Sequence, residues 1–446
     1  MSLPRPGGVN KGLRSSILRA FRWKNYRLFF AGQSFSLVGT WMQQVAMSWL
    51  VYRLTGSAFL LGVIGFVSMV PTLFVSPFAG VLADRWDRRR LLIATQGLAM
   101  AQAFVLAALV ISSSVQVWHI ILLSLLLGIV NSCDVPIRQS FVVEMIEAKE
   151  DLANAIALNS SMFHGTRLIG PSLAGMLISM VGEGVCFLVN GLSYIAVIVS
   201  LVAMRLEPRA RVPGKGKVLH EVLEGLSYAL SSPPIRSMLL LLAGMSLVGF
   251  PYVILLPVFA REVLLGGPHT FGFLMTATGT GSFVAALYLA SRPNVLGLSR
   301  LLVVSPALFG ACIAAFSFSR SLGLSLAILF FSGFAMMVLV TASNTIIQTV
   351  VDDDKRGRVM SLYTMAFMGV SPFGALVAGF MAGHIGAPHT VAIGGACSIL
   401  ASAIFACGLP ALRRMAGSGG RRRGGMPEGG YERDRTTGRD GKSGGR

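Results

Sequence analysis

Charged residues are scarce in this chain, and acidic residues are the scarcest. Of its 446 residues, 13% are charged, with 19 Asp and Glu against 38 Lys and Arg, whereas an ordinary soluble domain carries about 25% charged residues. The hydrophobic content of 54% and the mean hydropathy of +0.69 exceed what a soluble globule of this size can cover with polar surface. The composition therefore excludes a cytoplasmic enzyme, a disordered protein and a secreted disulfide scaffold. It indicates a polytopic helical membrane protein.

The sequence signals of several kinds of chemistry are also missing. The five cysteines lie in apolar stretches with no pair at metal-ligand spacing, so we expect no disulfide, no metal site and no catalytic thiol. No G-x-x-x-x-G-K-S/T pattern occurs, so we expect no ATP hydrolysis. The polar N-terminus lacks the short apolar core of a cleaved signal peptide. No nucleophile–base constellation points to an enzyme, and we expect no cofactor.

Twelve apolar stretches are long enough to cross a bilayer, whose core of about 30 Å needs roughly 20 helical residues. They fall at about 28–51, 59–83, 91–112, 118–137, 155–181, 184–204, 236–259, 270–291, 300–318, 322–344, 359–383 and 388–410. The sequence thus predicts an all-α membrane protein with two six-helix bundles. Its expected parts are an N-terminal arm (1–27), a first bundle (28–204), a linker (205–235), a second bundle (236–410) and a disordered Gly/Arg-rich tail (411–446).

A faint internal repeat supports this division into halves. In each half an acid leads into the fifth span and a proline follows 20 residues later. The corresponding residues are Asp151, Pro171 and Ala174 in the first half, and Asp352, Pro372 and Ala375 in the second. Two parallel six-helix repeats are a transporter architecture.

The basic residues are sorted onto one side of the predicted membrane. Because twelve spans place both termini on one side, 34 of the 38 Lys and Arg fall there, and only Arg53, Arg261 and Arg320 fall on the other. This is the positive-inside pattern, which predicts that both termini and the linker are cytoplasmic. It accounts for most of the net charge of +19 without a nucleic-acid partner.

The loop after the second span holds the most specific pattern in the chain. Residues 80–92 read G-V-L-A-D-R-W-D-R-R-R-L-L. Gly80 permits close approach of a neighbouring helix, and Asp84, one turn later, can face the positive N-terminal dipole of another helix. The arginines of the loop can pair with carboxylates. The alternative is that they only determine topology.

The fifth span carries an unusual charge, because Arg167 lies about 12 residues into an apolar stretch. A charge at that depth costs about 3 kcal/mol or more unless it faces a cavity or a partner. We therefore expect Arg167 to face a water-filled cavity and to bind an anionic or polar substrate group. The alternative is an arginine satisfied by backbone carbonyls and amide side chains. His164, nearly one turn earlier, can titrate near neutral pH or serve in packing.

The loop at 80–92 resembles the signature of the major facilitator superfamily, G-x-x-x-D-R-x-G-R-R, although Asp87 replaces the usual Gly. The matching residues are Gly80, Asp84, Arg85, Arg88 and Arg89. The resemblance implies two bundles around a substrate cavity near the midplane. It also implies a cytoplasmic latch in which Asp84 and Arg88 act with an acid of the fourth span, for which Asp134, with Arg138 one turn later, is the candidate.

The same resemblance points to further residues, because spans 1, 4, 7 and 10 line the cavity in that superfamily. It implies substrate contacts for Gln43, Tyr252 and Asn344, with helix–helix hydrogen bonding as the alternative. The fifth span also partly resembles the superfamily's antiporter signature G-P-x-x-G-G, with Ala replacing one Gly. The residues concerned are Gly170, Pro171, Ala174 and Gly175.

Four stretches together resemble the bacterial branch that exports siderophores and macrolides: D-R-W-D-R-R-R, D-V-P-I-R-Q, R-L-I-G-P and R-G-R-V-M-S-L. The resemblance implies a monomeric drug:proton antiporter of the cell membrane, whose partners are protons and a small amphipathic substrate. The candidates for proton coupling are Asp84, Asp134 and His164. The alternatives are a lysophospholipid flippase, a solute uptake carrier of the same fold, or a non-transporting membrane scaffold or receptor.

Overall fold

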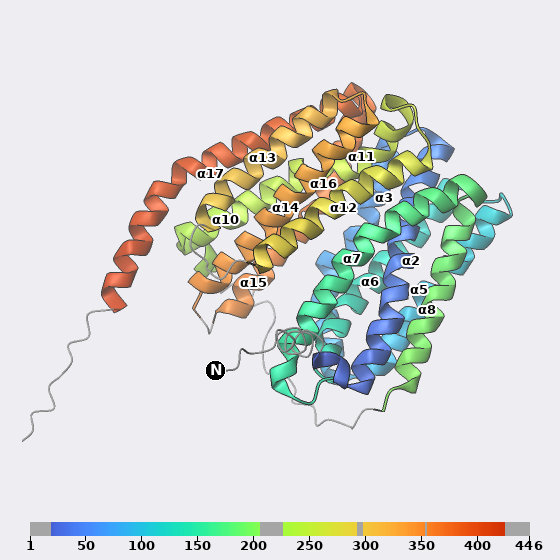
Figure 1. Cartoon of the computed structure of the whole chain (residues 1–446), viewed down its shortest axis with the longest axis horizontal. Coiled ribbons are helices and arrows are strands. Elements are labelled where there is room, and N and C mark those ends of the chain that lie inside the picture. The colour runs from blue at the N-terminus through green and yellow to red at the C-terminus, as the bar shows by residue number, and fades with distance from the viewer. Residues whose placement is uncertain (1–18, 206–225, 292–297, 353–354, 424–446) are drawn as a thin grey trace, which may run out of the picture.

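The computed structural model describes residues 19–205, 226–291, 298–352 and 355–423, and this part of the chain is helical apart from short turns (Figure 1). Ten of its helical segments are long and apolar enough to cross a membrane. Two further helices of that length, α2 (Lys24–Thr55) and α7 (Lys149–Val181), are less apolar because they carry polar residues such as Gln43 and Arg167. The chain is an all-helical membrane protein, as its hydropathy predicts.

The first bundle, as far as the structure describes it, runs from η1 to the end of α8. It comprises η1 (Arg19–Arg22), α2, α3 (Ala58–Met69), α4 (Pro71–Arg85), α5 (Arg88–Ile111), α6 (Val117–Val142), α7 and α8 (Glu183–Ala203). Helix α2 packs against α7 and α8, and α5 packs against α6 and α8. Helices α3 and α4 follow each other with only Val70 between them and together form the second span.

The second bundle contains two spans that are interrupted by π-helical turns. Its seventh span consists of α10 (Pro233–Gly244), η2 (Met245–Gly249), α11 (Tyr252–Val258) and η3 (Phe259–Val263). Then follow α12 (Pro268–Ala290), α13 (Leu298–Phe318), α14 (Leu322–Val350), α15 (Arg356–Thr364), η4 (Met365–Gly369), α16 (Ser371–Ile385) and α17 (Ala387–Arg423). The Ser246 hydroxyl in η2 donates a 2.5 Å hydrogen bond to the Phe367 carbonyl in η4, so the two interruptions lie against each other.

Helix α17 extends further than the sequence predicted. Disorder was expected from position 411, but the helix continues to Arg423 and projects away from the bundle (Figure 1). Ala411, Leu412 and Met415 favour helix, which accounts for the start of the extension, whereas the glycines at 417, 419 and 420 do not favour its last turns. Positions 424–446 of the expected tail lie outside the described residues, as do 1–18 of the arm and 206–225 of the linker.

Large apolar side chains cover the outer surface of both bundles. Val199, Leu240 and Ile404 each expose 60% or more of their surface, which would be unfavourable in water but suits contact with lipid. A helix satisfies its own backbone hydrogen bonds, so these segments can cross hydrocarbon. Trp86 and Trp118 are exposed near opposite ends of the first bundle, where amphipathic rings favour the membrane interfaces.

The two ends of the bundles differ in charge, and we name them accordingly. The basic end carries η1 and the turn between α4 and α5, with Arg88, Arg89 and Arg90. The arginine-poor end carries the short turns at Gly56, Gly182 and Gly386. These three glycines have positive φ (61°, 83° and 83°), a conformation that glycine adopts without strain.

Candidate functional site

The two halves meet at two equivalent helix crossings, α7 with α12 and α3 with α16. A glycine pair lies at the centre of each: Gly175 with Gly272, and Gly62 with Gly379. A Cβ on Gly175 would lie 3.1 Å from the Gly272 Cα, and one on Gly62 would lie 2.9 Å from the Gly379 Cα. Each crossing pairs the fifth span of one half with the second span of the other, as an internal two-fold repeat requires.

These crossings lie toward the arginine-poor end. Gly62 and Gly175 are within a few turns of that end of their helices, and the α7–α12 contact extends to mid-depth, where the Arg167 carbonyl faces Gly279. On the other crossing, Leu73 packs against Gly369 at a similar depth. Toward the basic end the halves diverge, with α15 lying apart from the first turns of α2 and α7 (Figure 1).

A polar contact also joins the halves at the arginine-poor end. The Tyr52 hydroxyl of α2 donates a hydrogen bond to the Glu262 carboxylate of η3, and the Arg261 guanidinium lies 6.0 Å from the centre of the Tyr52 ring. Beside them, within the first half, the Arg53 side chain donates to Glu183 at 2.7 and 3.3 Å. We call Tyr52, Arg261 and Glu262 the outer lock. Sequence reasoning missed it, although an acid among so few charges at this end was a usable signal.

Arg167 lies between the halves at mid-depth in α7. Its side chain is half-buried, and its guanidinium lies 5.5 Å from the centre of the Trp41 ring, within cation–π range. Trp41 in turn makes an edge contact with Phe163, one turn from Arg167. Among the described residues, no acidic side chain forms an ion pair with Arg167.

Polar groups surround Arg167 without hydrogen-bond partners. The Trp41 Nε1, His164 Nδ1 and Tyr252 hydroxyl are buried, and the first two form no hydrogen bond with another residue that the structure describes. The Tyr252 hydroxyl lies close to the hydroxyls of Thr278 and Ser332 and to the Arg167 guanidinium. Tyr252 and Arg167, which come from opposite halves, thus lie near each other.

Gln43 and Asn344 take other positions. Gln43 is buried inside the first bundle, where its amide donates to Gln102 at 3.0 Å and accepts from Asn190 at 2.7 Å. It therefore joins α2, α5 and α8, which is the helix–helix hydrogen bonding given above as the alternative, because both ends of its amide find partners there. Asn344 lies near the basic end of α14, where it accepts a 2.5 Å hydrogen bond from Gln348.

The turn between α4 and α5 is built from its own charged residues. Asp87, which departs from the family pattern, is the N-cap of α5 and accepts a 3.1 Å hydrogen bond from the Arg90 amide, a role that Asp performs well. Arg88 pairs with Glu144 at 2.8 Å, and Arg89 donates to the Val202 carbonyl at 2.6 Å. The side chains of the remaining expected latch residues, Gly80, Asp84 and Arg85, lie outside the described part of the structure. Glu144 was not anticipated.

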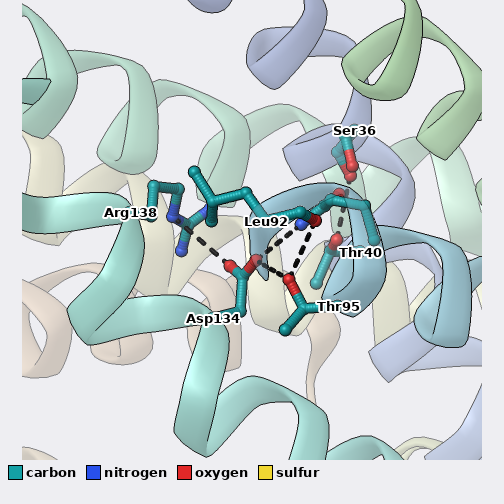
Figure 2. Close-up of polar contacts among 7 residues, drawn as sticks. Ser36, Thr40, Leu92, Thr95, Asp134 and Arg138 are labelled. Atoms are coloured by element: carbon teal, nitrogen blue, oxygen red, sulfur yellow. Dashed lines mark hydrogen bonds and ion pairs between the residues drawn. The ribbon is translucent and has the colours of Figure 1, made fainter. Parts of the chain in front are cut away.

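Asp134 is a buried acid held by a compact polar cluster (Figure 2). One carboxylate oxygen accepts hydrogen bonds from Thr95 (2.9 Å) and Gln96 (2.8 Å) of α5. The other lies 3.6 Å from the Arg138 Nε, one turn along α6. The geometry agrees with the expected Asp134–Arg138 pair, and Arg138 neutralises a charge that would otherwise be costly at this depth.

The antiporter-like stretch of α7 consists of contact residues. A Cβ on Gly170 would lie 2.5 Å from the Trp41 Cβ, so this glycine lets α7 approach α2. Ala174 is fully buried, and the Pro171 carbonyl would lie 2.6 Å from a Cβ on Gly272. Together with Gly175, these small residues let α7 contact both its own half and the other.

Comparisons with known proteins agree with this fold. Residues 15–421 match the model of a family described as transmembrane secretion effector. The staphyloferrin A transporter of Staphylococcus aureus is 25% identical over 380 residues, which cover 85% of this chain and 95% of that protein. Macrolide efflux protein A of Streptococcus pyogenes is 22% identical over 391 residues, which cover 84% and 94%.

Solved structures share the architecture. A bacterial homologue of the human lysosomal transporter Spinster, in an inward-facing and occupied conformation, superposes with a TM-score of 0.67. The identity is 13%, and the match covers 86% of this chain and 96% of that chain. At this identity the likeness shows the fold alone.

Proposed function

The chain belongs to the transmembrane secretion effector family of the major facilitator superfamily, and from that premise we propose that it is a proton-coupled exporter. Membership of this family makes it a membrane transporter and not an enzyme. Its proposed substrates are small amphipathic molecules such as drugs, macrolides or siderophore-like compounds, since its relatives include a macrolide efflux protein and a staphyloferrin A transporter. It works by rocking the two halves about a central site.

The observation that carries this proposal is the position of the contacts between the halves. They concentrate between mid-depth and the arginine-poor end, and the halves diverge at the basic end. The positive-inside rule assigns the basic end to the cytoplasm, together with both termini, the linker and the tail. The conformation is then open to the cytoplasm, the side from which an exporter takes its substrate.

The central site of the proposed transporter lies around Arg167, between α7 of one half and α11 of the other. Rocking closes the basic ends and opens the arginine-poor ends, so that Arg167 and Tyr252 face alternate sides. We assign the closing latch on the cytoplasmic side to Asp84 and Arg88. In the present conformation Arg88 is held by Glu144 of its own half.

Asp134 is the proposed proton carrier. It is a buried acid of α6, about two turns from the basic end of that helix, whereas Glu183 and Glu262 lie at the arginine-poor end. Protonation would remove its attraction to Arg138 while its Thr95 and Gln96 contacts can remain. The freed Arg138 can then take part in the rearrangement of the basic end.

Transport by everted membrane vesicles tests this proposal. Vesicles from cells that overproduce the chain are acidified inside and given a panel of labelled macrolides and siderophores. An exporter accumulates its substrate in these vesicles, and an ionophore that collapses the proton gradient abolishes accumulation. Uptake only under the opposite gradient identifies an uptake carrier, and movement of labelled lysophospholipid alone identifies a flippase.

A further inference from the structure

The site between the halves has an excess of positive charge and of hydrogen-bond donors. Arg167 has no acidic partner among the described residues. Asp134, a buried acid of α6, is already paired with Arg138. Every other acid whose side chain the structure describes lies near one end of the bundles. A ligand in this site therefore meets the positive charge of the Arg167 guanidinium, which no described acidic side chain neutralises.

The neutral groups of the site favour the same kind of ligand. The Trp41 Nε1 can only donate a hydrogen bond, whereas the Tyr252 hydroxyl and the His164 Nδ1 can each donate or accept one. The Trp41 Nε1 and the His164 Nδ1 are buried and unpartnered among the described residues, and the Tyr252 hydroxyl has only the neighbouring hydroxyls of Thr278 and Ser332 beside it. Buried donors without acceptors are costly, and an acceptor-rich ligand removes that cost.

The apolar part of the ligand has a place beside these donors. The Trp41 ring lies under the guanidinium on one side and contacts Phe163 edge-on. Phe163 is 42% exposed, so an aromatic face remains free next to the charge. Arg and Trp together suit an anionic group attached to a planar or apolar body.

From these observations we infer that the site selects amphipathic organic anions, with a carboxylate or phosphate group held by Arg167, Trp41 and Tyr252. The inference rests on the proposed function, because it names the substrate class of that same central site. It narrows the substrates proposed above to anionic ones and excludes cationic amphiphiles, since an ammonium group would face Arg167 with no acid to balance it.

Binding to the purified full chain in detergent tests the inference without any proton gradient. The probes share one apolar body: 2-naphthylacetate, its methyl ester and 2-(2-naphthyl)ethylamine. We expect the carboxylate to bind about 10-fold or more tightly than the ester and the amine, as one charge-assisted hydrogen bond implies. Equal affinities, a preference for the amine, or no binding of the carboxylate would overturn the inference.

Substitutions show which side chain produces the preference for the carboxylate probe. Arg167→Gln should abolish it while leaving the affinity for the ester unchanged, and Arg167→Lys should keep part of it. Arg320→Gln is the matched control, because Arg320 is an exposed arginine at the arginine-poor end. If Arg167→Gln does not fold, Trp41→Phe keeps the ring, loses the donor and should weaken carboxylate binding about 3- to 10-fold. A variant that weakens all three probes equally contradicts the inference.

The anionic group could belong to a soluble compound or to a lipid head group. A second pair of probes, lysophosphatidylglycerol and lysophosphatidylcholine, separates these sources. Tight binding of naphthylacetate without a preference between the two lipids indicates a soluble anion. Tighter binding of lysophosphatidylglycerol than of lysophosphatidylcholine indicates an anionic lysophospholipid. Because binding needs no transport, a charge preference without accumulation in vesicles would remove the proposed export and leave the anion site in place.

Discussion

The Tyr52 hydroxyl donates a hydrogen bond to the Glu262 carboxylate across the contact between the two halves. The two residues are 210 positions apart and lie at the arginine-poor ends of the first and seventh spans. The Arg261 guanidinium beside the Tyr52 ring adds a second contact between the halves. The opposite conformation, open at this end, requires both contacts to break.

Removing the outer lock should therefore shift the protein toward the state open at the arginine-poor end. A hydrogen bond to a charged group contributes about 1.5–3 kcal/mol, so Tyr52→Phe should raise the population of that state by about 10-fold or more. Spin labels at Ser113 and Ser321, one on each half, measure it by double electron–electron resonance. We expect a larger share of the molecules to show the longer distance between the two spin labels.

Tyr26→Phe is the matched control, because the Tyr26 hydroxyl donates to the Ala155 carbonyl of its own half, so that the substitution removes a hydrogen bond within one half. It should leave the distance distribution of the spin labels as in the wild type. A distribution that is the same in Tyr52→Phe as in the wild type would show that the Tyr52–Glu262 contact does not hold the halves together.

The glycine crossings should be intolerant of larger side chains. Gly175→Val places atoms against the Gly272 backbone, where a Cβ alone would already lie 3.1 Å from its Cα. We expect at least a 10-fold loss of transport in everted vesicles, with normal amounts of protein in the membrane. Gly97→Val is the control, since a Cβ at Gly97 meets nothing within 4 Å. Equal activity of the two variants would contradict the proposed role of the crossing.

Asp134→Asn should separate substrate movement from proton coupling. The amide oxygen of the variant can still accept the hydrogen bonds from Thr95 and Gln96, but the side chain can no longer gain or lose a proton. We expect accumulation against a gradient to be lost, whereas exchange of labelled for unlabelled substrate continues. Glu147→Gln, at an exposed acid near the basic end, should retain both activities. Proton-driven accumulation by Asp134→Asn would assign coupling to another residue.

Asp84→Asn tests the proposed latch at the basic end. The substitution removes the charge that would face the other half when the basic ends close. We expect efflux to be abolished while the protein reaches the membrane at wild-type levels, as measured by susceptibility assays and membrane immunoblots. Normal efflux by a well-expressed variant would remove the latch role.

Hydropathy alone predicts most of this fold, because each membrane-crossing segment needs about 20 apolar residues in one run. Ten of the predicted spans coincide with strongly apolar segments, and the two that contain Gln43 and Arg167 are still helices of membrane length. Hydropathy cannot detect a π-helical turn, since a change in the hydrogen-bonding register leaves the composition unchanged. The interruptions η2 and η4 were therefore not anticipated.

The candidate site was only partly predictable, because the side on which a polar residue of a helix faces depends on packing. Arg167 and Tyr252 do lie together, but Gln43, in an equally polar helix, turns into its own bundle toward Gln102. The contact of Tyr52 with Glu262 depends on how the two halves dock. The sequence marks Glu262 as an acid among few charges at this end, but it carries no direct signal for the partner of that acid.

Side-specific labelling of one cysteine tests the central claim, alternating access with the basic end on the cytoplasmic side. Ser160→Cys, two turns from Arg167 on the same face of α7, is introduced after the five native cysteines are replaced. Ser113→Cys marks the arginine-poor end. The account predicts that a membrane-impermeant thiol reagent labels Ser160→Cys in everted vesicles but not in intact cells, and that adding Tyr52→Phe makes it reactive from outside. If Ser160→Cys in the protein that retains Tyr52 is labelled only from outside intact cells, this result contradicts the account.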